Sequence, residues 1–242
     1  MRMTKKGAVD VDQVNVQIGE KKTYDDFGLR LSSIAIGFPE AKTNLIDIPG
    51  ADGSVDLTEA LGEIAYKNRS MELVFDALGG YEPWHALCTQ IANYLHGRRL
   101  KVILDTDPYY YYIGRLTLDT SKTNETLHEV VISGDMDPYK YELLSSMDEW
   151  LWDPFSFVDG VIRYYKQMSV QGSRTIRIPG RRKPVVPTIT SSAAMTVSFE
   201  GKSYVIRSGI QKVYGIVIRE GEQELVFNGT GTVSIDYRGG VL

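Results

Sequence analysis

The stretch IDIPGADGSVDLTEALGEIAYKNRSMELVF (residues 46–75) organises the first half of the chain. Its final part is a strand pattern, because Met71, Leu73 and Phe75 alternate with more polar neighbours and so fall on one side of an extended segment. Its first part contains Pro-Gly and Asp-Gly pairs at 49–53, which favour consecutive turns. We therefore expect turns, then a short extended piece over 54–57, and then a half-buried strand.

The acids and glycines of this stretch do not form a known metal or phosphate motif. If Gly53 were the sixth residue of an EF-hand loop, the first and third ligand positions would be Ile48 and Gly50, neither of which carries a carboxylate. A P-loop requires Gly-Lys-Ser/Thr after its glycines, and that sequence does not follow here. We expect no metal, cofactor or catalytic role for the stretch.

Downstream, GYEPWHALCTQIANYLHGRRLKV (80–102) predicts the one clear helix. Its apolar residues recur at helical spacing, a stripe that a 3.6-residue period places on one face. Pro83 suits the first helical turn and Gly97 suits the position just beyond the end. The helix is expected to lie across a sheet through Trp84, Leu87, Cys88, Ile91 and Leu95.

Upstream, TYDDFGLRLSSIAIG (23–37) reads as an acidic turn followed by a strand. Strict alternation predicts that the inward face of this strand carries Leu29, Leu31, Ser33 and Ala35.

Beyond about residue 145 the pattern becomes wholly β. Short β-rich runs alternate with Gly, Pro or Asn-Gly pairs, which is typical of an antiparallel sandwich. We expect a mainly β protein with a mixed α+β N-terminal domain over 1–145 and an all-β C-terminal domain over 146–242.

Composition narrows the functional classes. The 27 Lys and Arg against 31 Asp and Glu give a net charge of −4, so there is no general attraction to nucleic acid. The sequence carries neither an apolar signal segment nor a membrane-length apolar run, so we expect synthesis in a cytosol. The single cysteine, Cys88, excludes an internal disulfide, and the three histidines include no pair at metal-ligand spacing.

Two aromatic clusters are candidate recognition elements. Trp150 and Trp152 would share one face of an extended segment, which suits either stacking on a sugar or burial between domains. The Tyr-rich strand that contains Tyr109, Tyr110, Tyr111 and Tyr112 could present an exposed edge to a second subunit, or its alternate rings could pack under the helix. A carbohydrate-binding module is therefore the alternative to an assembly protein.

The order of these segments resembles the distal tail protein family of long-tailed, non-contractile bacteriophages. The resemblance covers roughly residues 22–142. It runs through YDDFGLRL, the Trp-bearing helix, GRRLKVILDTDPYYYYIGRL and VVISGDMDPYKYE. Its most specific part comprises Pro49, Gly50, Asp52, Gly53, Asp56, Leu57, Thr58, Tyr66, Lys67, Asn68 and Arg69.

The resemblance implies a fold and a role. It implies an N-terminal split β-barrel with one helix and a C-terminal galectin-like sandwich, without enzymatic activity or a cofactor. It implies a ring, usually hexameric, at the tip of the virion tail, assembled in the host cytoplasm. Its partners would be the tail tube protein and the tail-associated lysin, fibre hub or receptor-binding protein, with no tight nucleic-acid binding and no membrane. Within this resemblance the turn residues shape a hairpin.

Overall fold

The computed structural model describes residues 14–60, 62–78, 84–119, 128–148 and 164–242. Within these ranges the regular structure is mostly antiparallel strands, with two helices, so the predicted mainly β class is confirmed. The chain forms two compact units. Unit 1 takes the described residues up to Asp107 together with Tyr111–Pro138, and unit 2 takes Pro108–Tyr110 and the described residues from Tyr139 onward. The expected domain boundary at 145/146 stays a prediction. The last residue of unit 1 is Pro138, and unit 2 continues from Tyr139.

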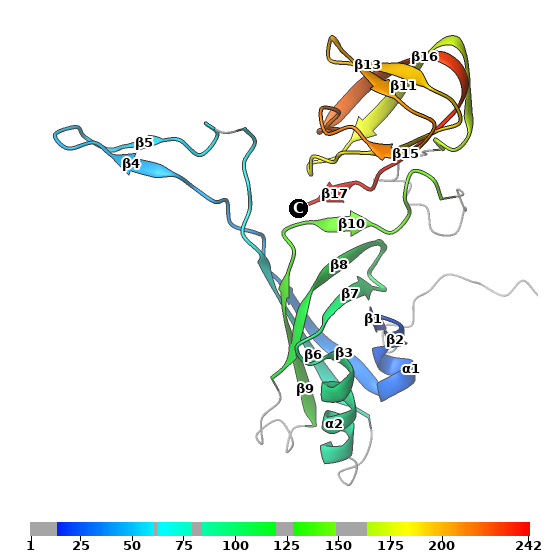
Figure 1. Ribbon diagram of the computed structural model, residues 1–242. Coiled ribbons are helices and arrows are strands. Elements are labelled where there is room, and N and C mark those ends of the chain that lie inside the picture. The colour runs from blue at the N-terminus through cyan, green and yellow to red at the C-terminus, as the bar shows by residue number, and fades with distance from the viewer. Residues whose placement is uncertain (1–13, 61, 79–83, 120–127, 149–163) are drawn as a thin grey trace, which may run out of the picture. The chain divides into compact units, whose positions relative to one another are not determined.

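Unit 1 is built on an antiparallel sheet in the order β2-β1-β7-β8-β9-β6-β3 (Figure 1). Its strands are β1 (Val16–Ile18), β2 (Lys21–Lys22), β3 (Leu29–Ile36), β6 (Arg69–Ala77), β7 (Arg99–Leu104), β8 (Asp107–Leu118) and β9 (Glu129–Met136). The predicted alternation in β6 is confirmed, because Met71, Leu73 and Phe75 are buried whereas Ser70 and Glu72 are exposed.

One helix covers a face of this sheet. Helix α2 (Trp84–Leu95) buries Trp84, Ile91 and Leu95, and these side chains belong to the same apolar core as Leu73 and Phe75 of β6. The predicted helix and its end are therefore confirmed, with Gly97 in the left-handed region at φ +73° just beyond it. Full burial of each large apolar side chain stabilises the unit by about 1.5–3 kcal/mol. A second, short helix, α1 (Thr23–Phe27), stands where the sequence predicted only an acidic turn.

Strand β3 departs from the predicted alternation. The pairing of β3 with β6 shifts between Leu31 and Ser33, so the strand contains a β-bulge. A bulge inserts one residue and exchanges the two faces beyond it. After the bulge Ile34 and Ile36 pack against the core, while Ser33 and Ala35 are exposed. The predicted inward positions of Ser33 and Ala35 are therefore wrong.

Unit 2 contains a six-stranded antiparallel sheet in the order β14-β13-β16-β12-β15, with β11 paired to β16. Its strands are β11 (Met168–Gly180), β12 (Thr188–Ser191), β13 (Met195–Phe199), β14 (Lys202–Ile206), β15 (Gly209–Lys212) and β16 (Gly221–Asp236). Its core is apolar and includes Ile178, Val197 and Phe227. Two short strands, β10 (Lys140–Glu142) and β17 (Gly240–Val241), pair with each other outside that sheet.

Glycines bend the long strands of unit 2 and do not end them. The sequence suggested that QELVF and TVSIDY were separate strands divided at Asn-Gly, but both belong to β16, which pairs with β11 along thirteen residues. Gly229 and Gly231 have φ values of +149° and +153°, and a Cβ on Gly229 would stand 2.6 Å from the Met195 Cβ. Both positions require glycine because the backbone conformation there is one that L side chains rarely adopt, and at Gly229 the first residue of β13 also approaches closely.

Candidate assembly surface

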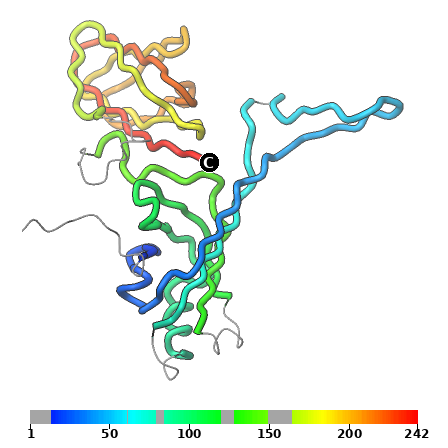
Figure 2. The backbone as a smooth tube through the Cα atoms, turned by 180° about the vertical axis from the view of Figure 1, so that it is seen from behind, coloured from blue at the N-terminus to red at the C-terminus, as the bar shows by residue number. Residues whose placement is uncertain are grey.

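The turn motif lies on a long two-stranded arm, defined here as residues 38–60 and 62–68, which leaves the sheet of unit 1 between β3 and β6 (Figures 1 and 2). Backbone hydrogen bonds form a ladder along it. Gly37 N–H donates to the Ser70 carbonyl at 3.0 Å, and Lys67 N–H donates to the Glu40 carbonyl at 2.8 Å. At the far end β4 (Leu45–Asp47) and β5 (Ser54–Asp56) pair antiparallel. The motif therefore builds a hairpin that extends away from its own sheet.

The motif residues stand at or near the tip of the arm. Ala51 N–H donates to the Ile48 carbonyl at 3.1 Å, which closes a turn around Pro49 and Gly50. Gly50 and Gly53 have φ values of +84° and +75°, a conformation that L side chains rarely adopt.

Asp56 caps the return strand of the arm. Its carboxylate accepts a hydrogen bond from the Thr58 N–H at 2.8 Å. Hydrogen bonds from the hydroxyl and the N–H of Thr58 hold the pKa of Asp56 below its ordinary value. This carboxylate is used to shape the turn, as an Asx-type contact does.

The tip of the arm exposes apolar side chains. Leu45 is 57% exposed and Ile48 is 49% exposed, and Ile46 and Val55 are also exposed. A two-stranded hairpin is at best marginally stable in water unless another element covers an apolar face. The arm thus has the character of a contact element, completed by a partner surface.

Arg69 lies at the base of the arm, as the first residue of β6 and outside the turns themselves. Arg69 is only 4% exposed, and its Nε and Nη2 atoms have no hydrogen-bond partner among the described residues. The guanidinium carbon lies 5.8 Å from the ring centre of Phe38 and 5.7 Å from that of Tyr112. Burial lowers the pKa of Arg69, and Tyr112 partly offsets that effect. Two aromatic rings therefore hold a buried cation where the arm joins the sheet.

The predicted exposed tyrosine edge is wrong. Tyr112 pairs with Val102 of β7, whereas β9 pairs with β8 only from Gly114 to Leu118, and Tyr110, Tyr111 and Tyr112 are all buried. Tyr112 belongs to the apolar core that includes helix α2, which agrees with the alternative expectation that tyrosine rings pack under the helix. Tyr109 is half-buried, and an interface role for these tyrosines stays a prediction. The other aromatic candidates, Trp150 and Trp152, lie outside the described residues.

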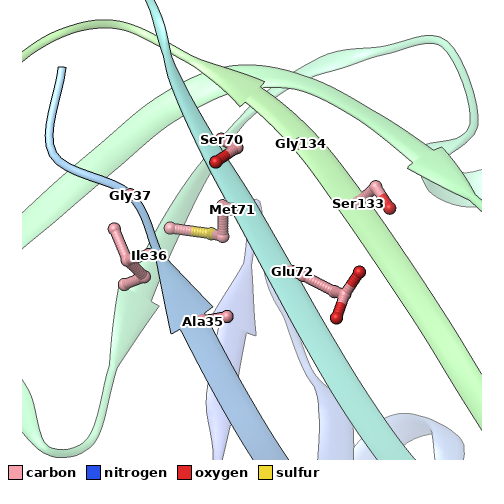
Figure 3. A pocket seen from close by; sticks show the side chains of 8 residues that line it. All are labelled: Ala35, Ile36, Gly37, Ser70, Met71, Glu72, Ser133 and Gly134. Atoms are coloured by element: carbon pink, nitrogen blue, oxygen red, sulfur yellow. The ribbon is translucent and has the colours of Figure 1, made fainter. Parts of the chain in front are cut away.

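The described residues include a pocket with polar lining groups. They contain no group of three His, Cys, Asp or Glu side chains close enough to hold a metal ion. The pocket crosses β3, β6 and β9, where Glu72 is the one charged lining residue beside Ser70 and Ser133 (Figure 3). In the described part of the chain no helix is both long enough and apolar enough to span a bilayer.

Sequence patterns did not identify four exposed apolar or aromatic residues that the structure reveals. Phe38, at the start of the arm, is 84% exposed although its ring faces Arg69. In unit 2, Val205, Ile210 and Tyr214 are exposed large apolar residues on or beside β14 and β15. Alternation in a strand separates two faces, but it does not tell which face another element covers.

The molecule thus belongs to a structural class of mainly β chains with a sheet-and-helix unit that bears a long arm, followed by an all-β unit. No family model matches the sequence, and neither does any curated protein. Among solved structures the chain is similar to SPP1 Dit (gp 19.1), described as a paradigm of the hub adsorption apparatus in phages that infect Gram-positive bacteria. The TM-score is 0.61 at 14% identity, over 95% of this chain and 100% of that chain. The two proteins therefore share a fold.

Proposed function

We propose that this protein is a structural component of a bacteriophage tail tip. The observation that carries the proposal is the likeness to SPP1 Dit, which extends over the whole of that chain and includes both units. A likeness over a single common β-domain would carry less weight, because common folds host many functions. The absence of a metal cluster among the described residues is compatible with a role in assembly.

Within that role, we assign the chain to a ring of its own copies, with six the expected number. The ring joins the tail tube to the tail-associated lysin, fibre hub or receptor-binding protein. The uncovered arm supports self-assembly, because it exposes apolar residues that unit 1 itself does not bury. A closed ring requires contacts between unlike surfaces of neighbouring copies, and a projecting arm is one way to supply such a contact.

Electron microscopy of the purified chain, mixed with tail tubes assembled from the tube protein of the same phage, tests this function. The proposal predicts ring-shaped density that caps one end of the tubes. Tubes with both ends bare at saturating concentrations of the chain would contradict it. Binding along the tube walls would contradict it equally, because an adaptor at the tail tip recognises an end.

A further inference from the structure

Strand pairing places two exposed apolar side chains together on one face of the arm. Ile46 stands directly opposite Val55, so the two side chains share a face, whereas Leu45 pairs with Asp56 and Asp47 pairs with Ser54 on the other. Ile46 is 46% exposed and Val55 is 43% exposed. The arm therefore requires a cover for its apolar face, because two strands alone bury too little.

Charge restricts the choice of that cover. Between residues 43 and 66 the sequence contains no Lys or Arg. The acids in this segment are Asp47, Asp52, Asp56, Glu59 and Glu63. An acidic and apolar element binds best to a surface that is both apolar and basic, because complementary charge steers the encounter and fixes the register.

Unit 2 exposes apolar and basic side chains along two successive strands and the loop that follows them. Strands β14 and β15 are the first and last strands of the main sheet order of unit 2. Val205 and Ile210 are each 76% exposed, and Tyr214 is 80% exposed. No Asp or Glu occurs between residues 201 and 218. The exposed cations there are Lys202, Arg207 and Lys212. We call Val205, Arg207, Ile210, Lys212 and Tyr214 the β14–β15 surface.

We propose that the arm of one copy docks on the β14–β15 surface of a second copy, with apolar residues against apolar residues and acids against cations. This inference rests on the self-assembly proposed above and names its contact. A head-to-tail ring needs two different, mutually complementary surfaces on every copy, and these two surfaces form such a pair. Aromatic and aliphatic side chains at the centre with charges at the rim are the usual anatomy of an interface.

A charge-swap experiment on the full chain tests the contact. Variant A carries Asp52→Lys and Glu59→Lys on the arm, and variant B carries Arg207→Glu and Lys212→Glu on the β14–β15 surface. All four side chains are exposed, so both variants should fold normally. Two matched controls, Glu20→Lys and Lys166→Glu, change the charge of unit 1 and unit 2 away from either surface. Circular dichroism and thermal unfolding verify the fold of every variant.

Mass by light scattering at low salt then gives the result. Variants A and B alone should each assemble about tenfold or more weakly than the wild type, since each places like charges in contact. An equimolar mixture of A and B should recover assembly, because each arm then meets a surface of opposite charge. Both controls should assemble as the wild type does. A higher salt concentration should reduce the difference in assembly between each variant and the wild type, because salt screens exposed charges.

The remaining outcomes separate this contact from the proposed function. If A and B alone form the wild-type ring, the contact is wrong and the ring stands. If B assembles normally and A does not, the arm binds elsewhere and the proposal is overturned. If the mixture fails but a chain with all four changes assembles, the arm docks on its own chain, which also overturns it. Open oligomers with the predicted loss and rescue would support the contact and contradict the ring. A wild-type chain that is monomeric at every concentration would overturn both.

Discussion

Replacement of Arg69 by Met should stabilise unit 1. Arg69 is 4% exposed, and two of its donor atoms have no partner among the described residues. Each unsatisfied buried donor costs about 1–3 kcal/mol, and more when it belongs to a charged group. Met keeps the unbranched stem between Phe38 and Tyr112 but loses two cation–π contacts, each worth about 0.5–2 kcal/mol, and the side-chain hydrogen bond between Arg69 and Tyr112. These losses offset most of the relief, so the net expectation is a gain of up to about 1 kcal/mol in the free energy of unfolding.

Urea unfolding of the single chain measures this change. Arg69→Met should raise the midpoint with an unchanged slope, and only for the transition of unit 1. Arg69→Ala is the matched control, since it also removes the charge but leaves a void. It should be about 2–5 kcal/mol less stable than the Met variant. If Arg69→Met lowers the free energy of unfolding by more than about 1 kcal/mol, this prediction is wrong. Such a loss would show that the Arg69 guanidinium has hydrogen-bond partners for its donors in the folded chain.

Three further predictions concern the bulge, the bent strands and the arm. Ile34→Ala should destabilise unit 1 by about 1–3 kcal/mol and Ala35→Ser by less than about 0.5 kcal/mol in urea unfolding, and the reverse order would contradict the bulge. Gly229→Ala should lower the free energy of unfolding by about 3 kcal/mol, because the new Cβ meets Met195. Gly172 also has a positive φ but has open space around it, so Gly172→Ala should lower the free energy of unfolding by about 1 kcal/mol. Equal decreases in the thermal unfolding midpoint would contradict this prediction. Thr58→Ala should raise the pKa of Asp56 toward 3.8, as followed by NMR titration. A lowered pKa of Asp56 in the folded state stabilises the folded arm at pH values above the pKa of Asp56 in the unfolded chain. The difference in stability between the wild type and Thr58→Ala should therefore vanish as the pH falls through the folded-state pKa of Asp56. An unchanged titration of Asp56 in the variant would show that Thr58 does not hold the carboxylate.

Local patterns predicted the elements whose cause is local. The helical stripe from Trp84 to Leu95 specifies α2, and alternation from Met71 to Phe75 specifies β6, because burial on one face selects the period. The turn at Pro49 and Gly50 followed from the backbone preferences of those residues. The mainly β character of the second half followed from β-rich runs at short spacing.

The errors have tertiary causes. Nothing local marks the extra residue between Leu31 and Ser33, because the bulge is a property of the pairing with β6. The tyrosines of β8 suggested an edge, yet tertiary packing decides exposure, and Tyr110, Tyr111 and Tyr112 are buried. Asn228-Gly229 suggested a turn, but β11 pairs across it and keeps the strand continuous.

The candidate surfaces were predicted only in part. The turn residues marked the tip of the arm, whereas the burial of Arg69 between two rings depends on Phe38 and Tyr112, which come from different strands or loops. The β14–β15 surface was missed because Val205 and Ile210 read as ordinary strand residues until their exposure is known.

The proposed function depends on several copies of this chain closing into a ring. The most direct test is the solution mass of the purified wild-type chain by light scattering, over a wide range of concentrations. The account predicts one discrete species of about six chains that persists on dilution, as a closed symmetric interface requires. A mass of one chain at every concentration, or a mass that grows without limit, would contradict it.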